Sequence, residues 1–161
     1  MAAKTAIEYL RFKWLIPGKI AGAPHPDLCN GLSAVAPFLR SQGVAAIVTL
    51  FDRPLQPNPE DLGFRSLFVE TPNYRPPPDL LRVIVFMEDV LDQAAVLVHC
   101  YAGIGRTGTV LCAWLLRQDP TLLAADAIAR VRENYIPAYA RTRFPEDPSQ
   151  AEAIERFAQS R

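Results

Sequence analysis

The chain has 161 residues, half of them apolar, and 17 acidic residues balance 17 basic ones. This length predicts a single domain spanning residues 1–161, and the zero net charge argues against recruitment of nucleic acid or an anionic membrane. The first 14 residues lack the apolar region of a secretory signal, and no apolar run is long enough to cross a bilayer. Three cysteines without paired spacing argue against a disulfide framework. We therefore expect a cytoplasmic, monomeric protein with free thiols.

Alternating strand and helix patterns predict a three-layer α/β domain, with a mostly parallel sheet between two helical layers. Short strands are expected at 12–16 and 19–23. A helix should cover 28–42, with a kink or a division at Pro37, because proline removes a backbone donor. The near-continuous apolar run at 44–51 is typical of a strand covered on both faces. Further strands are expected at 64–70 and 95–99, and further helices at 79–92, 106–117, 122–134 and 148–159.

The segment HCYAGIGRTG, residues 99–108, carries the clearest chemical signal. It places a glycine-bearing loop between a buried strand and an apolar helix, and ligands of open α/β sheets bind at that position. Inward-facing loop amides and the positive helix N-terminus together suit a phosphate dianion. The residues expected to bind phosphate are Tyr101, Ala102, Gly103, Ile104, Gly105 and Arg106.

Two side chains of this segment suit phosphoryl transfer. Cys100 lies at the base of the loop, where positive potential favours the thiolate, the nucleophilic form of the side chain. Arg106 offers a planar fork that binds two phosphate oxygens, which lysine cannot imitate. The alternative is a buried structural cysteine with an unrelated arginine nearby. The combined spacing of Cys, Gly, Arg and Thr in a strand–loop–helix context argues against that alternative.

The same segment resembles the active-site loop of protein tyrosine and dual-specificity phosphatases. WLIPGKIAGAPHP, GVAAIVTLFDRP, TPNYRPPPDL and AIARVREN also resemble, in order, blocks of the small atypical dual-specificity phosphatases and their prokaryotic relatives. The resemblance implies a reaction without metal or other cofactor, in which Cys100 forms a phosphocysteine that water hydrolyses. It also implies a phosphorylated protein or small phosphomonoester as substrate, with phosphotyrosine first and dual specificity open. Phosphate, sulfate or vanadate should bind in the loop.

Three neighbouring side chains receive supporting roles from the resemblance. Thr107 would stabilise the departing sulfur in the second step, or cap the following helix. His99 would brace the loop through hydrogen bonds. Gln150 would orient the hydrolytic water, or complete a capping box behind Asp147, the expected N-cap of the last helix.

The general acid is missing from its expected place. Relatives carry an aspartate where TPNYRPP has Asn73, and an amide has no proton to donate at a useful pKa. We expect Asp52 to replace it, because Asp52 ends a central strand at the sheet edge of the loop and relatives often carry a carboxylate there. The alternative for Asp52 is a salt bridge or loop cap beside Arg53. The other carboxylates considered are Asp61, Glu70 and Asp79, the last more suited to helix capping.

Four further residues have weaker signals. Arg141 and Arg143 could contact a phosphate-bearing substrate, but solvated loop charges are the commoner outcome. Cys112 is expected to pack in the core, and Cys29, beside Asn30-Gly31, to be accessible.

Two other functions stay open at this point. A pseudophosphatase that binds phosphate with little turnover is motivated by Asn73, and a sulfur transferase could use a similar cysteine loop. The retention of Cys100 and Arg106 favours the phosphatase. Ala102 and Ile104 place no lysine in the loop, which disfavours phosphoinositide substrates.

Overall fold

One five-stranded sheet forms the centre of the molecule in the computed structural model, which describes residues 11–161. The strands are β1 (Lys13–Ile16), β2 (Ile20–Ala23), β3 (Val44–Phe51), β4 (Arg65–Glu70) and β5 (Ala95–His99), in the spatial order β1-β2-β5-β3-β4. β1 is antiparallel to β2, and every other neighbouring pair is parallel. The predicted mostly parallel sheet is confirmed.

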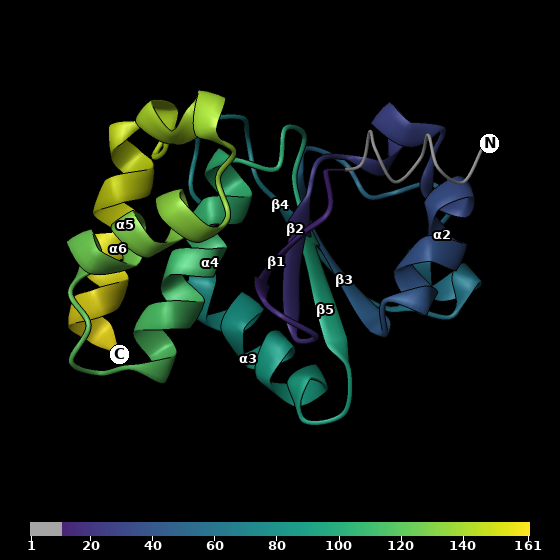
Figure 1. Cartoon of the computed structure of the whole chain (residues 1–161), viewed down its shortest axis with the longest axis horizontal. Coiled ribbons are helices and arrows are strands. Elements are labelled where there is room, and N and C mark those ends of the chain that lie inside the picture. The colour runs from purple at the N-terminus through teal and green to yellow at the C-terminus, as the bar shows by residue number, and fades with distance from the viewer. Residues whose placement is uncertain (1–10) are drawn as a thin grey trace.

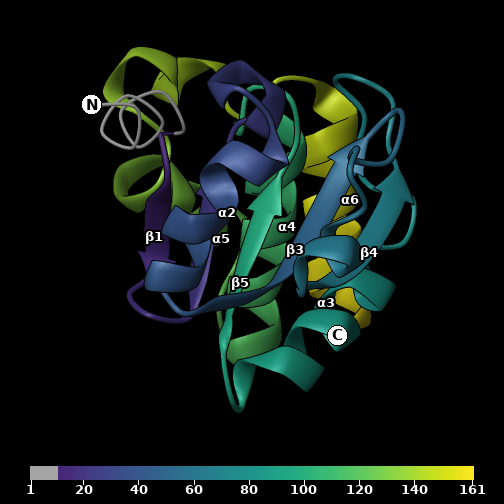
Figure 2. The ribbon, with the colours of Figure 1, turned by 90° about the vertical axis from the view of Figure 1, so that its right-hand side faces the viewer.

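Helices cover both faces of the sheet (Figures 1 and 2). α2 (Leu32–Ser41) packs on one face, while α3 (Leu80–Leu91), α4 (Gly105–Gln118), α5 (Ala124–Asn134) and α6 (Pro148–Ser160) lie on the other. Short 3-10 helices occur in the connections as η1 (Pro26–Cys29), η2 (Pro59–Leu62) and η3 (Ala138–Arg143). The predicted three-layer arrangement is therefore confirmed. Within residues 11–161, none of the helices combines the length and apolarity needed to cross a membrane.

The central strands feed two separate cores, because successive side chains of a strand point to opposite faces. In β3, Val48 belongs to the larger core under α3 to α6, whereas Ile47 belongs to the smaller core under α2. In β5, Val98 belongs to the larger core and Leu97 to the smaller one. All five residues of this strand are buried. Coverage of both faces explains why these strands read as near-continuous apolar runs.

The helical region before β3 differs from the prediction. Its division lies at Asn30-Gly31, whose φ angles of 69° and 91° are left-handed, so η1 ends there and α2 starts at Leu32. Pro37 lies within α2, so a division of the helix at Pro37 was wrong. Cys29 is buried at the end of η1, which contradicts the expected accessibility of its thiol. Cys112 is fully buried in α4, as predicted.

Helix α4 contacts the segment before α6 at a position without a side chain. The ring of Phe144, itself fully buried, lies against Gly108 so closely that a Cβ there would overlap the ring carbons. Arg132 of α5 also donates from Nε to the carbonyl oxygen of Phe144 at 2.6 Å. These contacts fix the chain just before α6 relative to the start of α4.

We expect Gly108→Ala to destabilise the protein by about 1–3 kcal/mol through overpacking against Phe144. Helix propensity alone would give the opposite sign, about 0.5–1 kcal/mol of stabilisation. Urea unfolding of the variant measures the free energy directly. Phe144→Leu should reduce the cost of Gly108→Ala in a double-mutant cycle. A more stable Gly108→Ala protein would contradict the contact.

Candidate active site

The loop singled out in the sequence lies at the carboxyl edge of the parallel strands. β5 ends at His99, residues 100–104 form the loop, and α4 begins at Gly105. β2 and β3 lie on either side of β5 and run parallel to it, so their last residues reach the same edge. The strand–loop–helix context therefore has the geometry in which α/β sheets bind ligands.

Cys100 lies at the inner end of this loop. Its side chain is buried, with 2% of the residue exposed. The hydroxyl of Thr107, one turn into α4, donates to the Cys100 sulfur at 3.2 Å. Thr107 does not cap α4, whose N-cap is Ile104 without a side-chain cap. The base of the loop therefore holds a hydrogen-bond donor directed at the Cys100 sulfur.

His99 joins the loop to the neighbouring strand. Its ring is fully buried, with Nε2 2.9 Å from Thr49 Oγ1 and Nδ1 3.0 Å from the carbonyl oxygen of Cys100. Burial lowers the pKa of His99 to about 3, so the ring is neutral at neutral pH. Because a carbonyl only accepts, Nδ1 carries the proton and donates to Cys100, and Nε2 accepts from Thr49.

The next three carbonyls of the loop also accept hydrogen bonds from outside. The backbone N–H of His25 donates to Tyr101 at 2.8 Å, the Arg11 guanidinium donates to Ala102, and the Tyr135 hydroxyl donates to Gly103 at 2.7 Å. In a planar trans peptide the C=O and the next N–H point in opposite directions. The amides of residues 101–104 therefore point away from these donors, toward the interior of the loop.

Gly103 is required for the loop to pass close to β2. Its φ of 72° is left-handed, and a Cβ would lie 2.7 Å from the backbone carbon of Ala23.

Arg106 is buried, and its guanidinium faces the segment that follows β4. Its two terminal nitrogens donate to the carbonyl oxygen of Thr71 at 2.9 Å and to Asn73 Oδ1 at 3.4 Å. The guanidinium carbon lies 5.4 Å from the centre of the Phe51 ring. Asn73 thus contacts the proposed phosphate-binding arginine with an amide oxygen, in the place where the resemblance led us to expect an acid.

Two polar side chains, from the segment before α6 and from its first turn, lie against the loop. The carboxylate of Glu146 lies against Gly105. A Cβ atom added to Gly105 would overlap this carboxylate and would lie 2.7 Å from Nε2 of Gln150. Gln150 is fully buried, its Oε1 accepts from the backbone N–H of Glu146 at 2.9 Å, and its Nε2 has no partner. Asp147 caps α6 by accepting from Ser149 N at 2.8 Å. Gln150 does not reach Asp147, so the strict capping box is absent.

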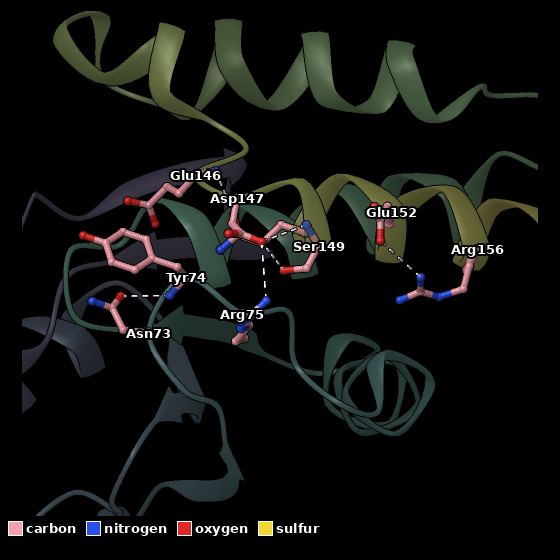
Figure 3. A network of polar contacts seen from close by, with 9 residues as sticks. Asn73, Tyr74, Arg75, Glu146, Asp147, Ser149, Glu152 and Arg156 are labelled. Carbon is pink, nitrogen blue, oxygen red and sulfur yellow. Dashed lines mark hydrogen bonds and ion pairs between the residues drawn. The ribbon is translucent and has the colours of Figure 1, made fainter.

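The β4–α3 connection meets this segment at the surface. Figure 3 shows Asn73, Tyr74 and Arg75 facing Glu146 and Asp147. Arg75 and Asp147 form an ion pair of 3.8 Å. The pKa of Asp147 lies below its usual range, first because Ser149 donates hydrogen bonds to it and then because of Arg75.

Asp52 follows β3 at the same sheet edge and is exposed. Within residues 11–161 its carboxylate makes no hydrogen bond or ion pair, and Arg53 instead lies over the Phe51 ring at 5.8 Å. Asp52 lies near His25. Burial has the largest effect on the pKa of His25 and lowers it, whereas the negative charge of Asp52 acts to raise it. His25 in turn packs on His99 with ring centres 5.3 Å apart.

The other residues considered in the sequence analysis make structural contacts or are exposed. Asp79 caps α3 by accepting from Arg82 N at 3.0 Å. Arg141 donates to the carbonyl oxygens of Glu133 and Ile136, so it braces η3. Arg143 is exposed at the end of η3. In the described part of the chain, no three His, Cys, Asp or Glu side chains cluster as metal ligands would.

Sequence reasoning missed His25, Tyr135, Arg11 and Glu146. The first three act on loop carbonyls from distant segments, and no local pattern marks such a contact. Glu146 precedes the predicted N-cap of α6, which was the only signal that could have drawn attention to it.

A model of the family described as "Swiss Army Knife protein, DSP-PTPase phosphatase domain" matches residues 10–142. The mouse dual specificity protein phosphatase 12 is 36% identical over an alignment of 98 residues, which covers 56% of this chain and 29% of the mouse protein. The chain thus spans less than a third of that relative.

Solved structures agree on the fold. A mutant form of Tk-PTP superimposes with a TM-score of 0.75 at 26% identity, covering 92% of this chain and 95% of the other. PTPMT1 in complex with PI(5)P gives a TM-score of 0.74 at 17% identity, covering 92% and 95%. The chain belongs to the DSP-PTPase phosphatase domain family, which confirms the resemblance seen in the sequence.

The neutral state of His99 makes stability depend on pH. Its pKa of about 3 in the folded protein lies below the usual 6.5, so only the unfolded chain gains a proton as the pH falls from 6.5 toward 3. Stability from His99 is complete above pH 6.5 and should fall by about 2 kcal/mol by pH 5. Urea unfolding at pH 7 and pH 5 should show this loss in the wild type and a smaller one in His99→Gln. Equal losses in both proteins would contradict a neutral His99.

Proposed function

We propose that the chain hydrolyses phosphomonoesters through a phosphocysteine on Cys100. The observation that carries the proposal is the buried Cys100 sulfur, which accepts a hydrogen bond from the Thr107 hydroxyl at 3.2 Å. The carbonyl groups of the surrounding loop accept hydrogen bonds from donors outside the loop. That arrangement gives the sulfur a hydrogen-bond donor and leaves the loop amides for three phosphate oxygens. The amides of residues 101–106 and the Arg106 side chain would bind the substrate phosphate.

Arg106 has donors left for phosphate. A guanidinium carries five N–H groups, and contacts to Thr71 and Asn73 use two of them. The same contacts hold its plane in place before substrate arrives. In the transition state the remaining donors would bind the equatorial oxygens of the transferred phosphoryl group.

Asp52 is the group proposed to protonate the leaving oxygen in the first step. Asn73 cannot do so, and its amide oxygen accepts hydrogen bonds from Arg106 and from Tyr74 N. Asp52 is exposed, unpaired in residues 11–161, and adjacent to Phe51, whose ring packs on Arg106. In the second step Thr107 would stabilise the departing sulfur while Gln150 orients the water.

Phosphotyrosine in a protein is the proposed substrate, with dual specificity open. The rings of Phe51 and Tyr101 stack 6.1 Å apart beside the loop, and half of Tyr101 is exposed, so an aromatic substrate finds an apolar surface. PTPMT1 is described in complex with PI(5)P, but the lysine-free loop here, with Ala102 and Ile104, favours a phosphoprotein.

Cys100→Ser should lower kcat on an aryl phosphate by about 10⁴-fold or more, because a serine hydroxyl here has neither ionisation nor a base. Binding of inorganic phosphate, followed by calorimetry, should persist. The assay is run with and without a chelator, which should have no effect. A wild-type protein that binds phosphopeptides without turning them over would instead be a pseudophosphatase binding module.

Asp52→Asn should slow hydrolysis of phosphoserine peptides by about 10²-fold or more and affect activated aryl phosphates much less. The basic limb of the kcat/KM profile should disappear with the carboxyl group. Glu70→Gln, at the end of the neighbouring strand β4, is the matched control and should leave both properties unchanged. If Asp52→Asn keeps the wild-type leaving-group dependence, another group or solvent supplies the proton.

A further inference from the structure

Glu146 brings a carboxylate to the phosphate loop from the segment just before α6. Its Oε1 lies directly against the Cα of Gly105, the first residue of α4 and a member of the proposed phosphate-binding loop. Within residues 11–161 this carboxylate forms no ion pair, and only the backbone N–H of Glu146 is hydrogen-bonded, to Gln150. Its position over the loop is therefore not explained by a structural partner.

Gln150 gives a second, independent indication of a ligand at this place. Its Nε2 is buried, has no hydrogen-bond partner and lies beside Glu146 Oε1 over the same Cα. Leaving a buried donor unpaired is unfavourable, so such a group is expected to bind a ligand or water. The donor of Gln150 and the acceptor of Glu146 together match the two hydrogen-bonding faces of one water molecule.

The segment that carries Glu146 is held firmly on both sides. Phe144 is fully buried against Gly108, and Asp147 caps α6 through Ser149. The ion pair of Asp147 with Arg75 adds a surface contact to the β4–α3 connection (Figure 3). The carboxylate thus has a defined position before substrate binds, as a group that acts on a bound water requires.

We propose that Glu146 is the general base for hydrolysis of the phosphocysteine, a role that rests on the proposed function and deepens it. Gln150 donates to the water oxygen, and Glu146 accepts a water proton as that oxygen attacks phosphorus. The P–O bond forms while the P–S bond breaks, so the sulfur leaves as the Cys100 thiolate, bonded by Thr107. The products are inorganic phosphate and a protonated Glu146, which returns its proton to solvent.

The two carboxylates would then serve different steps. Asp52 follows β3 and lies near His25, whereas Glu146 lies over Gly105 just before α6. Asp52 acts before the phosphocysteine forms and changes kcat/KM, because that parameter includes only the steps up to the first irreversible one. Glu146 acts afterwards and changes kcat alone when hydrolysis limits turnover.

The test is rapid-quench kinetics of Glu146→Gln on an aryl phosphate, with Glu152→Gln as the matched control. Glu152 is an exposed carboxylate in α6, the helix that follows Glu146, and within residues 11–161 its ion pair is with Arg156 (Figure 3). In Glu146→Gln we expect kcat to fall by about 10²–10⁴-fold while kcat/KM and the burst rate stay unchanged. The burst should approach one phenol per Cys100, phosphocysteine should accumulate, and the acidic limb of kcat should be lost. Glu152→Gln should behave as wild type.

The outcomes separate the inference from the proposed function. An unchanged kcat in Glu146→Gln, repeated in Glu146→Ala, would overturn the role of Glu146. A parallel fall of kcat/KM that grows with poorer leaving groups would also overturn it, because Glu146 would then act in the first step. A wild-type protein that forms no phosphocysteine and releases no phosphate would instead refute the proposed function itself.

Discussion

The active-site region depends on close backbone approach at three positions that lack a side chain. Gly103 passes within van der Waals contact of the Ala23 backbone, Gly105 lies beneath Glu146 and Gln150, and Gly108 receives the ring of Phe144. These contacts join the loop to β2 on one side and to the segment before α6 on the other. A methyl group at any of them would separate elements that must meet for the site to form.

The electrostatic character of the loop follows from where its carbonyls point. Four consecutive carbonyl oxygens, from Cys100 to Gly103, accept from His99, His25, Arg11 and Tyr135 in turn. The amides that follow them are therefore oriented before any anion binds, and no reorganisation is needed during the proposed reaction. A neutral His99 suits this arrangement, because it fixes the direction of the first of these hydrogen bonds.

Local patterns predicted the sheet, the helices and the loop, because burial on two faces and phosphate geometry both constrain short stretches of sequence. They could not predict what meets the loop from afar: Tyr135 follows α5 and reaches Gly103 through tertiary packing alone. Pro37 was the stronger local signal for dividing a helix, yet the division follows Asn30 and Gly31, which supply left-handed conformations. The sequence shows that position 73 lacks an acid, but it could not predict that the Asn73 side chain contacts Arg106.

That contact gives a physical reason for an amide at position 73. A carboxylate there would lie about as near to Arg106 as the amide oxygen does, at 3.4 Å, and a charge-assisted pair is much stronger than a neutral hydrogen bond. It would compete with substrate phosphate for the guanidinium. Asp52 and Glu146 form no ion pair with Arg106 in the described chain. In the proposed reaction, carboxylates placed apart from the arginine supply the proton transfers, while Asn73 orients the guanidinium without neutralising it.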